Sequence, residues 1–199
     1  PITNIVLMGM GEPLHNYRNL IVALENMLHG NGQNFSHRRV TVSTVGLVPA
    51  LKKLASTLPV NIAISLNSTT HGQRAKVMPI TNRYSLNELM ETCRDLPLPN
   101  GKRITFEYVM MEGFNSSMSD AERLVTLMKG LPAKVNLIPY NENPDRDIRR
   151  PSQDRVKAFQ HHLVSNGINC SIRVTRGRDI SAACGQLGKA AENADSRLG

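Results

Sequence analysis

The feature that most constrains the fold of this chain is the alternation of short apolar runs with amphipathic stretches along most of its length. The short runs are typical of buried strands, and the stretches between them carry apolar residues at helical spacing. Such alternation predicts βα units and a parallel sheet, closed or partly closed into a barrel. The expected strands are Asn4–Met8, Val40–Thr44, Val60–Leu66, Arg103–Met110, Lys134–Ile138 and Asn169–Val174, and the expected helices are Tyr17–His29, Leu47–Ser56, Leu86–Asp95, Asp120–Met128 and Ser152–Ser165.

The size of the chain allows a single domain. Its 199 residues are enough to bury a core, and we expect one domain over residues 1–189 with a flexible tail at 190–199. The chain starts with Pro1 and enters an apolar run almost at once, so we expect an upstream part to be missing. No apolar run approaches the ~18 residues of a membrane helix, and no basic segment precedes the first apolar run. These features predict a cytoplasmic protein without membrane contact, and we expect a monomer.

The chain is basic, with a formal net charge of +8 and a pI of about 9.8. One interpretation is a generally basic surface; the other is that grouped arginines contact the phosphates of a nucleic acid. The chain has no Trp and only 4% aromatic residues, so a stacking platform for single strands is not evident. The candidate phosphate contacts are Arg38, Arg39, Arg149, Arg150, Arg176 and Arg178.

Small polar residues recur where the expected strands end. Gly11 and Glu12 follow the first strand, Ser43 lies near the end of the second, and Asn141 follows the fifth. The third strand runs into Ser65-Leu66-Asn67. The carboxyl ends of parallel strands share one rim, where ligands bind. Turns also contain such residues for conformational reasons alone, but their recurrence at successive strand ends favours a shared ligand site.

The Gly-rich turn after the first strand offers one carboxylate to that rim. Gly9 and Gly11 permit a close approach of backbone to ligand, and Pro13 restricts Glu12 to extended geometry. A carboxylate placed there can bind a ligand ammonium group, although a solvated Glu in a turn explains the motif equally well. The spacing is not that of a dinucleotide-binding G-x-G-x-x-G motif, and the chain has no G-x-S-x-G hydrolase elbow.

The three cysteines differ in their surroundings. Cys93 lies on the apolar stripe of an expected helix, and Cys170 alternates with apolar residues on the last expected strand, so both are expected in the core. Cys184 follows an Arg-rich turn among small residues, which leaves its sulfur accessible and favours the thiolate. The spacing alone leaves open whether Cys184 is reactive. The irregular spacing argues against a disulfide framework, and no His/Cys pattern predicts a metal held by this chain.

Taken together, these stretches resemble the RlmN/Cfr family of radical S-adenosylmethionine RNA methyltransferases, most closely the RlmN branch that acts on adenine carbon 2. The resemblance covers nearly the whole chain, and its last motif is the most specific. The matching stretches are Gly9–Leu14, Val42–Gly46, Ile64–Asn67, Met78–Ile80, Val135–Asn141, Thr175–Gly177, Asp179–Ile180 and Ala182–Leu187.

The resemblance implies a radical S-adenosylmethionine partial (βα) barrel whose first strand and cluster loop lie upstream. It also implies that Glu12 binds the α-ammonium of S-adenosylmethionine. Asn67 stands where many relatives have His, which puts that single contact in doubt. The implied cofactor contacts are Gly11, Glu12, Ser43, Ser65, Leu66, Asn67 and Asn141.

The resemblance further implies a methyl-cysteine intermediate at Cys184 and a radical mechanism that carries its carbon to adenine carbon 2 of 23S ribosomal RNA, and of transfer RNA. Electrons would come from a flavodoxin or ferredoxin. The 4Fe–4S cluster of this family needs three cysteines in a C-x-x-x-C-x-x-C loop, which this chain does not contain. We therefore expect no metal ligand in this part of the protein and no activity from it alone.

Two other functions are compatible with parts of the pattern. A different radical enzyme would share only the Gly-Glu-Pro element, whereas a non-catalytic RNA-binding module would need only the arginines. A rim that binds the cofactor beside one alkylatable thiol would separate the proposed enzyme from an RNA-binding module.

Overall fold

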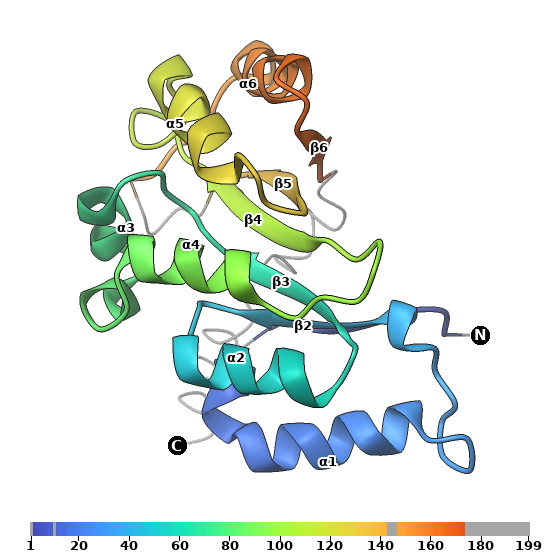
Figure 1. Cartoon of the computed structure of the whole chain (residues 1–199). Coiled ribbons are helices and arrows are strands. Elements are labelled where there is room, and N and C mark those ends of the chain that lie inside the picture. Colours follow the sequence, from blue (N-terminus) through green and yellow to red (C-terminus); the bar gives the residue numbers. More distant parts are fainter. Residues whose placement is uncertain (1, 10, 143–146, 174–199) are drawn as a thin grey trace, which may run out of the picture.

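The computed structural model describes residues 2–9, 11–142 and 147–173 of the chain. Within these residues the strands form one parallel sheet in which neighbours follow chain order from β1 to β6 (Figure 1). This arrangement confirms the expected α/β class and the parallel strands. The strands are β1 (Ile5–Leu7), β2 (Val40–Thr44), β3 (Asn61–Ser65), β4 (Ile104–Met110), β5 (Ala133–Pro139) and β6 (Asn169–Ile172).

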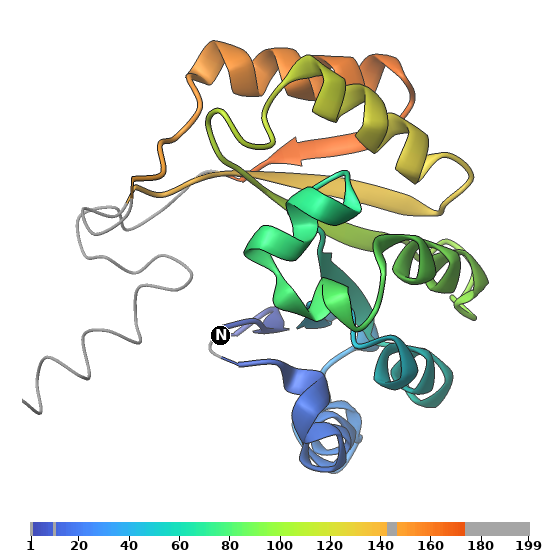
Figure 2. The ribbon, with the colours of Figure 1, turned by 90° about the vertical axis from the view of Figure 1, so that its left-hand side faces the viewer.

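The helices between the strands wrap the outer face of the curved sheet (Figure 2). The sequence did not predict α3, which lies beyond the carboxyl end of β3 (Figure 1). Serine or threonine side chains cap α3, α4, α5 and α6 by accepting a backbone N–H of the first turn. The helices are α1 (Tyr17–Leu28), α2 (Val48–Thr57), α3 (His71–Val77), α4 (Leu86–Asp95), α5 (Met118–Met128) and α6 (Gln153–Ser165), with short 3-10 helices η1 (Pro13–Asn16), η2 (His37–Arg39) and η3 (Pro79–Asn82).

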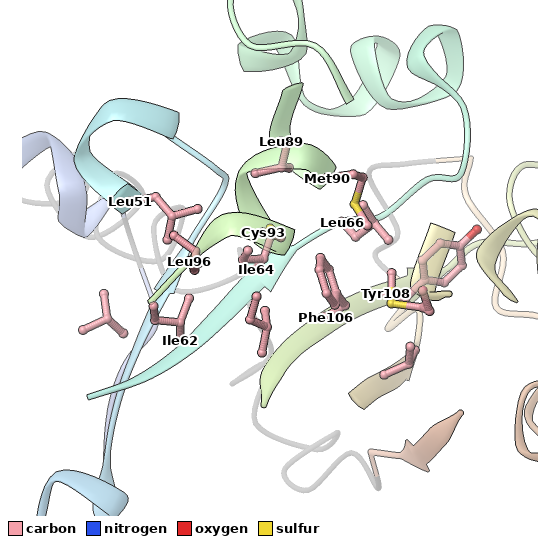
Figure 3. Close-up of a cluster of buried hydrophobic side chains, with 14 of the residues drawn as sticks. Leu51, Ile62, Ile64, Leu66, Leu89, Met90, Cys93, Leu96, Phe106 and Tyr108 are labelled. Atoms are coloured by element: carbon pink, nitrogen blue, oxygen red, sulfur yellow. The ribbon is translucent and has the colours of Figure 1, made fainter. Parts of the chain in front are cut away.

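The core lies between the sheet and these helices. Successive side chains of a strand point to opposite faces, so Phe106 and Tyr108 of β4 turn towards the helices and are fully buried. Leu89 and Cys93 of α4 pack in the same cluster, against β3 and β4 (Figure 3). Burial of a side chain as large as Phe106 contributes about 1.5–3 kcal/mol. The helix face of the sheet therefore supplies stability, which leaves the other face for other roles.

The sheet is curved enough to bring its first and last strands towards one another. The guanidinium of Arg173, just after β6, lies 3.9 Å from the Met8 sulfur, just after β1. Among the described residues no helix covers the inner, concave face (Figure 2). A curved sheet of parallel strands with one open face is the expected partial barrel. None of the helices in the described ranges has the length and apolar character needed to cross a membrane.

Candidate functional site

Glu12 lies where β1 and β2 end, as the sequence predicted. Its backbone is extended (φ −109°, ψ 112°) before Pro13, and Gly11 precedes it with φ +81°. One carboxylate oxygen accepts the N–H of Leu14 at 3.1 Å and the other accepts the N–H of Val45 at 2.8 Å. A carboxylate has about four acceptor sites, so Glu12 can still accept hydrogen bonds from a cationic ligand while it ties the Gly-rich turn to the end of β2.

A buried arginine that sequence reasoning missed holds the next two strand ends. Arg74 of α3 is 1% exposed. Its Nη2 donates to the carbonyls of Val45 (2.7 Å) and Ser65 (3.1 Å), its Nε to the carbonyl of Leu66 (3.1 Å), and its Nη1 to the hydroxyl of Thr81 (2.8 Å). Burial lowers the pKa of Arg74 to about 10, so the guanidinium remains charged at neutral pH. Glu12 and Arg74 thus grip opposite sides of Val45, one through its N–H and one through its carbonyl.

Asn67 continues this network to the end of β4. It adopts a left-handed backbone with φ +56°, which Asn tolerates better than most residues. Its Oδ1 accepts the N–H of Val109 at 3.0 Å, and its carbonyl accepts a hydrogen bond from Asn115 Nδ2 at 2.8 Å. Its Nδ2 lies 3.5 Å from the Met78 sulfur, a weak acceptor. The predicted cofactor contact therefore also positions the rim.

Asn115 is the second rim residue that sequence reasoning missed. It is fully buried, and its Nδ2 also donates to the carbonyl of Val109 at 2.7 Å. Its Oδ1 accepts the N–H of Met111 at 2.7 Å, while its own carbonyl accepts the Tyr108 hydroxyl at 2.8 Å. These bonds fix the turn after β4 against the end of β3. A side-chain amide that follows a strand within a few residues is the only local signal of this role.

The concave face carries a polar cluster around Glu107 of β4. Glu107 is 7% exposed, and its register neighbours are Ser65 on β3 and Asn136 on β5. Burial raises its pKa, against the opposing influence of Arg173 and of hydrogen bonds from Asn136 and Ser43. A carboxylate within the otherwise apolar run Ile104–Met110 was the available signal. The cluster places a titratable group among hydroxyl, amide and guanidinium groups at the centre of the open face.

The other predicted cofactor contacts lie around the same rim. Ser43 and Ser65 belong to β2 and β3, and Asn141 lies half-buried just after β5. Leu66 has its side chain in the core; its N–H donates to the Glu107 carbonyl at 2.9 Å and its carbonyl accepts from Arg74. The structure thus brings the described members of the predicted set to one end of the sheet, with Leu66 turned inward.

The predicted RNA contacts are divided between the two ends of the sheet. Arg38 and Arg39 form part of η2, just before β2 begins. Arg149 lies at the opposite end, where its carbonyl accepts the N–H of Glu112 after β4, and Arg150 follows it. A single contact area at the rim cannot include both pairs. The remaining two predicted contacts, Arg176 and Arg178, and the predicted catalytic Cys184 lie outside the described residues, as does the expected tail at 190–199.

The two described cysteines have the surroundings that the sequence predicted. Cys93 is buried in the core and Cys170 is half-buried on β6. Burial raises the pKa of each thiol to about 12, which keeps both protonated and unreactive at neutral pH. In the part of the chain that the structure describes, no group of three or more His, Cys, Asp or Glu side chains could hold a metal ion. These residues therefore do not form an iron–sulfur site.

Comparison with known proteins identifies close relatives. No protein-family model matches the chain. It is 57% identical over 187 residues to the "Dual-specificity RNA methyltransferase RlmN" of Anaeromyxobacter sp. (strain Fw109-5), covering 94% of this chain and 50% of the relative. It is 49% identical over 192 residues to the "Dual-specificity RNA methyltransferase RlmN 2" of Myxococcus xanthus, covering 96% of this chain and 51% of the relative. The chain thus spans about half the length of the curated relatives it matches.

Solved structures agree with the sequence comparison. A radical SAM methyltransferase from Sphaerobacter thermophilus superposes with a TM-score of 0.89 at 44% identity, over 93% of this chain and 55% of that one. A domain of pyruvate-formate lyase-activating enzyme from Bacteroides vulgatus superposes with a TM-score of 0.68 at 17% identity, over 87% of this chain and 100% of that domain. The second likeness shows the fold alone, and the first joins it to close sequence similarity.

Proposed function

We propose a function for this chain from the family to which it belongs, the RlmN-type radical S-adenosylmethionine RNA methyltransferases. The chain forms the part of such an enzyme that binds S-adenosylmethionine and carries the cysteine through which a one-carbon unit reaches carbon 2 of adenine in ribosomal RNA, and in transfer RNA. The observation that carries this proposal is 57% identity over 94% of the chain to a protein named RlmN. The parallel sheet with its polar rim supports the same assignment.

The rim fits the cofactor in charge and shape. S-adenosylmethionine supplies, when bound, both a methyl group and the radical that activates it. Glu12 offers acceptor sites for the α-ammonium group beside Gly11, whose lack of a side chain leaves room for a ligand. Ser43, Ser65 and Asn141 offer further hydrogen-bonding groups around the same rim. Arg74 and Asn115 hold the strand ends that carry these residues, so the site is ordered before the cofactor binds.

We assign the acceptor of the methyl group to Cys184. The two other cysteines are held in or against the core with raised pKa values, which leaves Cys184 as the thiol available for transfer. The described residues do not fit a 4Fe–4S cluster, so its ligands belong to the half of the relatives that this chain does not span. Electron supply by a flavodoxin or ferredoxin and a monomeric state remain part of the proposal, on the basis of the family.

The proposal predicts that Glu12→Gln weakens cofactor binding in the full-length protein that contains this chain. Loss of a hydrogen bond to a charged group costs about 1.5–3 kcal/mol, which calorimetric titration with S-adenosylmethionine would measure. Because Glu12 also accepts the N–H groups of Leu14 and Val45, the substitution should lower the free energy of unfolding by about 0.5–2 kcal/mol, a typical cost for a lost cap.

Glu25→Gln, at an exposed position of α1, is the matched control and should leave both quantities unchanged. Normal cofactor affinity in the Glu12→Gln variant would remove Glu12 from the site. A protein that binds RNA but no S-adenosylmethionine at all would instead support the non-catalytic RNA-binding module.

A further inference from the structure

The end of the sheet opposite the rim carries its own group of cations. Arg38 and Arg39 lie just before β2, and Lys102 and Arg103 lie just before β4. The starts of β2, β3 and β4 face the same side of the molecule, the right-hand side of Figure 1. At roughly 3.3 Å per residue, the seven residues of β4 place this end about 20 Å from the rim. These cations are therefore remote from the proposed cofactor site.

No carboxylate neutralises this group within the described residues. The one ion pair found there joins Arg123 to Asp120, on α5. Lys102 donates through Nζ to the carbonyl of Pro59, and burial together with the nearby Arg38 lowers its pKa. Like charges held side by side without an acid favour the binding of an anion.

A pocket of about 510 Å³ lies beside these cations. Pro59, whose carbonyl binds Lys102, forms part of its wall, and His37 on the wall is the first residue of η2, next to Arg38. Its volume is within the range of small-ligand sites, about 300–1,000 Å³. The lining residues are Leu28, Asn34, Phe35, Ser36, His37 and Pro59, of which none is acidic.

The wall of the pocket is held in place by backbone hydrogen bonds. Phe35 donates its N–H to the Met27 carbonyl at 2.8 Å, and Asn34 donates to the His29 carbonyl at 3.2 Å. The loop is thereby fixed to the last turn of α1. An aromatic ring and an imidazole in a fixed loop next to cations match the way in which proteins bind unpaired nucleotides, with the base on a ring and the phosphate on basic side chains.

We propose that this second site, which we call the amino-end site (the pocket with Arg38, Arg39 and Lys102), binds one unpaired nucleotide of the RNA substrate. The base occupies the pocket against Phe35 and His37, and the flanking phosphates lie on Arg38 and Lys102. The inference rests on RNA being the partner, as proposed above. It adds an RNA contact remote from the rim, so that the enzyme reads a longer stretch of RNA than its reacting adenine.

Fluorescence anisotropy with a short, labelled single-stranded RNA tests this proposal on the full-length protein that contains the chain. The double variant Arg38→Ala/Lys102→Ala should bind about tenfold more weakly, and the slope of log affinity against log salt should fall by about two, one for each lost phosphate contact. Phe35→Leu, which keeps the apolar volume of a side chain packed on the core, should weaken binding without changing the salt slope, since it removes stacking alone.

The matched control is Lys76→Ala/Lys157→Ala, which removes two exposed cations from α3 and α6. It should change affinity less than about twofold if position matters more than net charge. Arg38→Ala/Arg39→Ala removes two exposed side chains only, and so keeps the test valid if loss of Lys102 disturbs folding. Equal losses in the control and amino-end variants would overturn the amino-end site.

Unchanged affinity in all variants would also overturn the inference, while leaving the proposed function intact if the protein still methylates RNA. A parent protein that binds no RNA would overturn both. As a direct measurement, photo-crosslinking of RNA that contains 4-thiouridine should label the peptide with Phe35 and His37 in the parent protein. Labelling confined to peptides of the rim would contradict the proposal.

Discussion

At the scale of single residues, the rim depends on a charge that is buried without an acid. Arg74 has no carboxylate partner among the described residues, yet it donates four hydrogen bonds to three carbonyls and one hydroxyl. Burying a charged group is costly unless its donors are satisfied, and here all the bonds end on strand ends or on η3. The residue therefore exchanges desolvation for the fixed geometry of the site.

Arg74→Met should lower the free energy of unfolding by about 3–5 kcal/mol, as expected when one member of a buried polar network is removed and its acceptors are left unpaired. Lys76→Met on the same helix is exposed and should change stability by less than about 0.5 kcal/mol. Urea unfolding followed by circular dichroism measures both. A loss below about 1 kcal/mol at Arg74 would contradict the network.

Glu107 gives the stability of the chain a distinct pH dependence. Its pKa is raised in the folded state by burial, so the folded chain holds this proton to higher pH than the unfolded chain does. The contribution of Glu107 is therefore fully present below its unfolded pKa and is lost as pH rises through its folded pKa. Glu107→Gln cannot ionise and should gain stability relative to the parent over this interval.

Unfolding free energies measured at a series of pH values from about 4 to 7, the range above an ordinary Glu pKa, test this expectation. The difference between Glu107→Gln and the parent should move in favour of the variant as pH rises. Glu91→Gln, exposed on α4, should show a constant difference. A constant difference for Glu107→Gln as well would mean that its carboxyl group ionises normally.

At the scale of elements, the pattern of the sequence predicted the strands and most helices but not the bonds between strand ends. Alternating apolar runs identify β2 and β4 because burial on one face is a local property. The helix α3 carries no apolar stripe, since its buried residue is Arg74. The capping signature Thr70-x-x-Gln73 was present and was the signal that could have found it.

The candidate site divides along the same line. Glu12 could be predicted because Gly11 and Pro13 fix its backbone locally. The roles of Arg74 and Asn115 could not, because each depends on partners brought near only by the folded sheet. The division of the arginines between two ends of the sheet is likewise a property of topology and not of spacing.

Asn115→Ala tests whether the turn after β4 depends on one amide. The substitution leaves three buried backbone groups without their partner, which should cost about 3 kcal/mol or more. Hydrogen exchange should accelerate most at Met111, whose N–H binds Asn115 Oδ1. Asn87→Ala, exposed on α4, should leave exchange unchanged; equal protection of Met111 in both variants would contradict this role.

At the scale of the whole molecule, the two faces of the sheet have separate tasks. The outer face buries the core under the helices (Figure 2), while the concave face and the rim carry the polar groups around Glu12 and Glu107. The chain spans about half of the length of its curated relatives. The whole protein is therefore expected to place the remaining catalytic groups over this open face.

The most direct test of the account is mass spectrometry of Cys184-containing peptide from full-length protein purified from active cells. The account predicts the added mass of one methyl group on Cys184, and none on Cys93 or Cys170, whose thiols have pKa values of about 12. It also predicts that Cys184→Ala abolishes RNA methylation while cofactor binding persists. An unmodified Cys184 in active enzyme, or a Cys184→Ala variant that still methylates RNA, would contradict it.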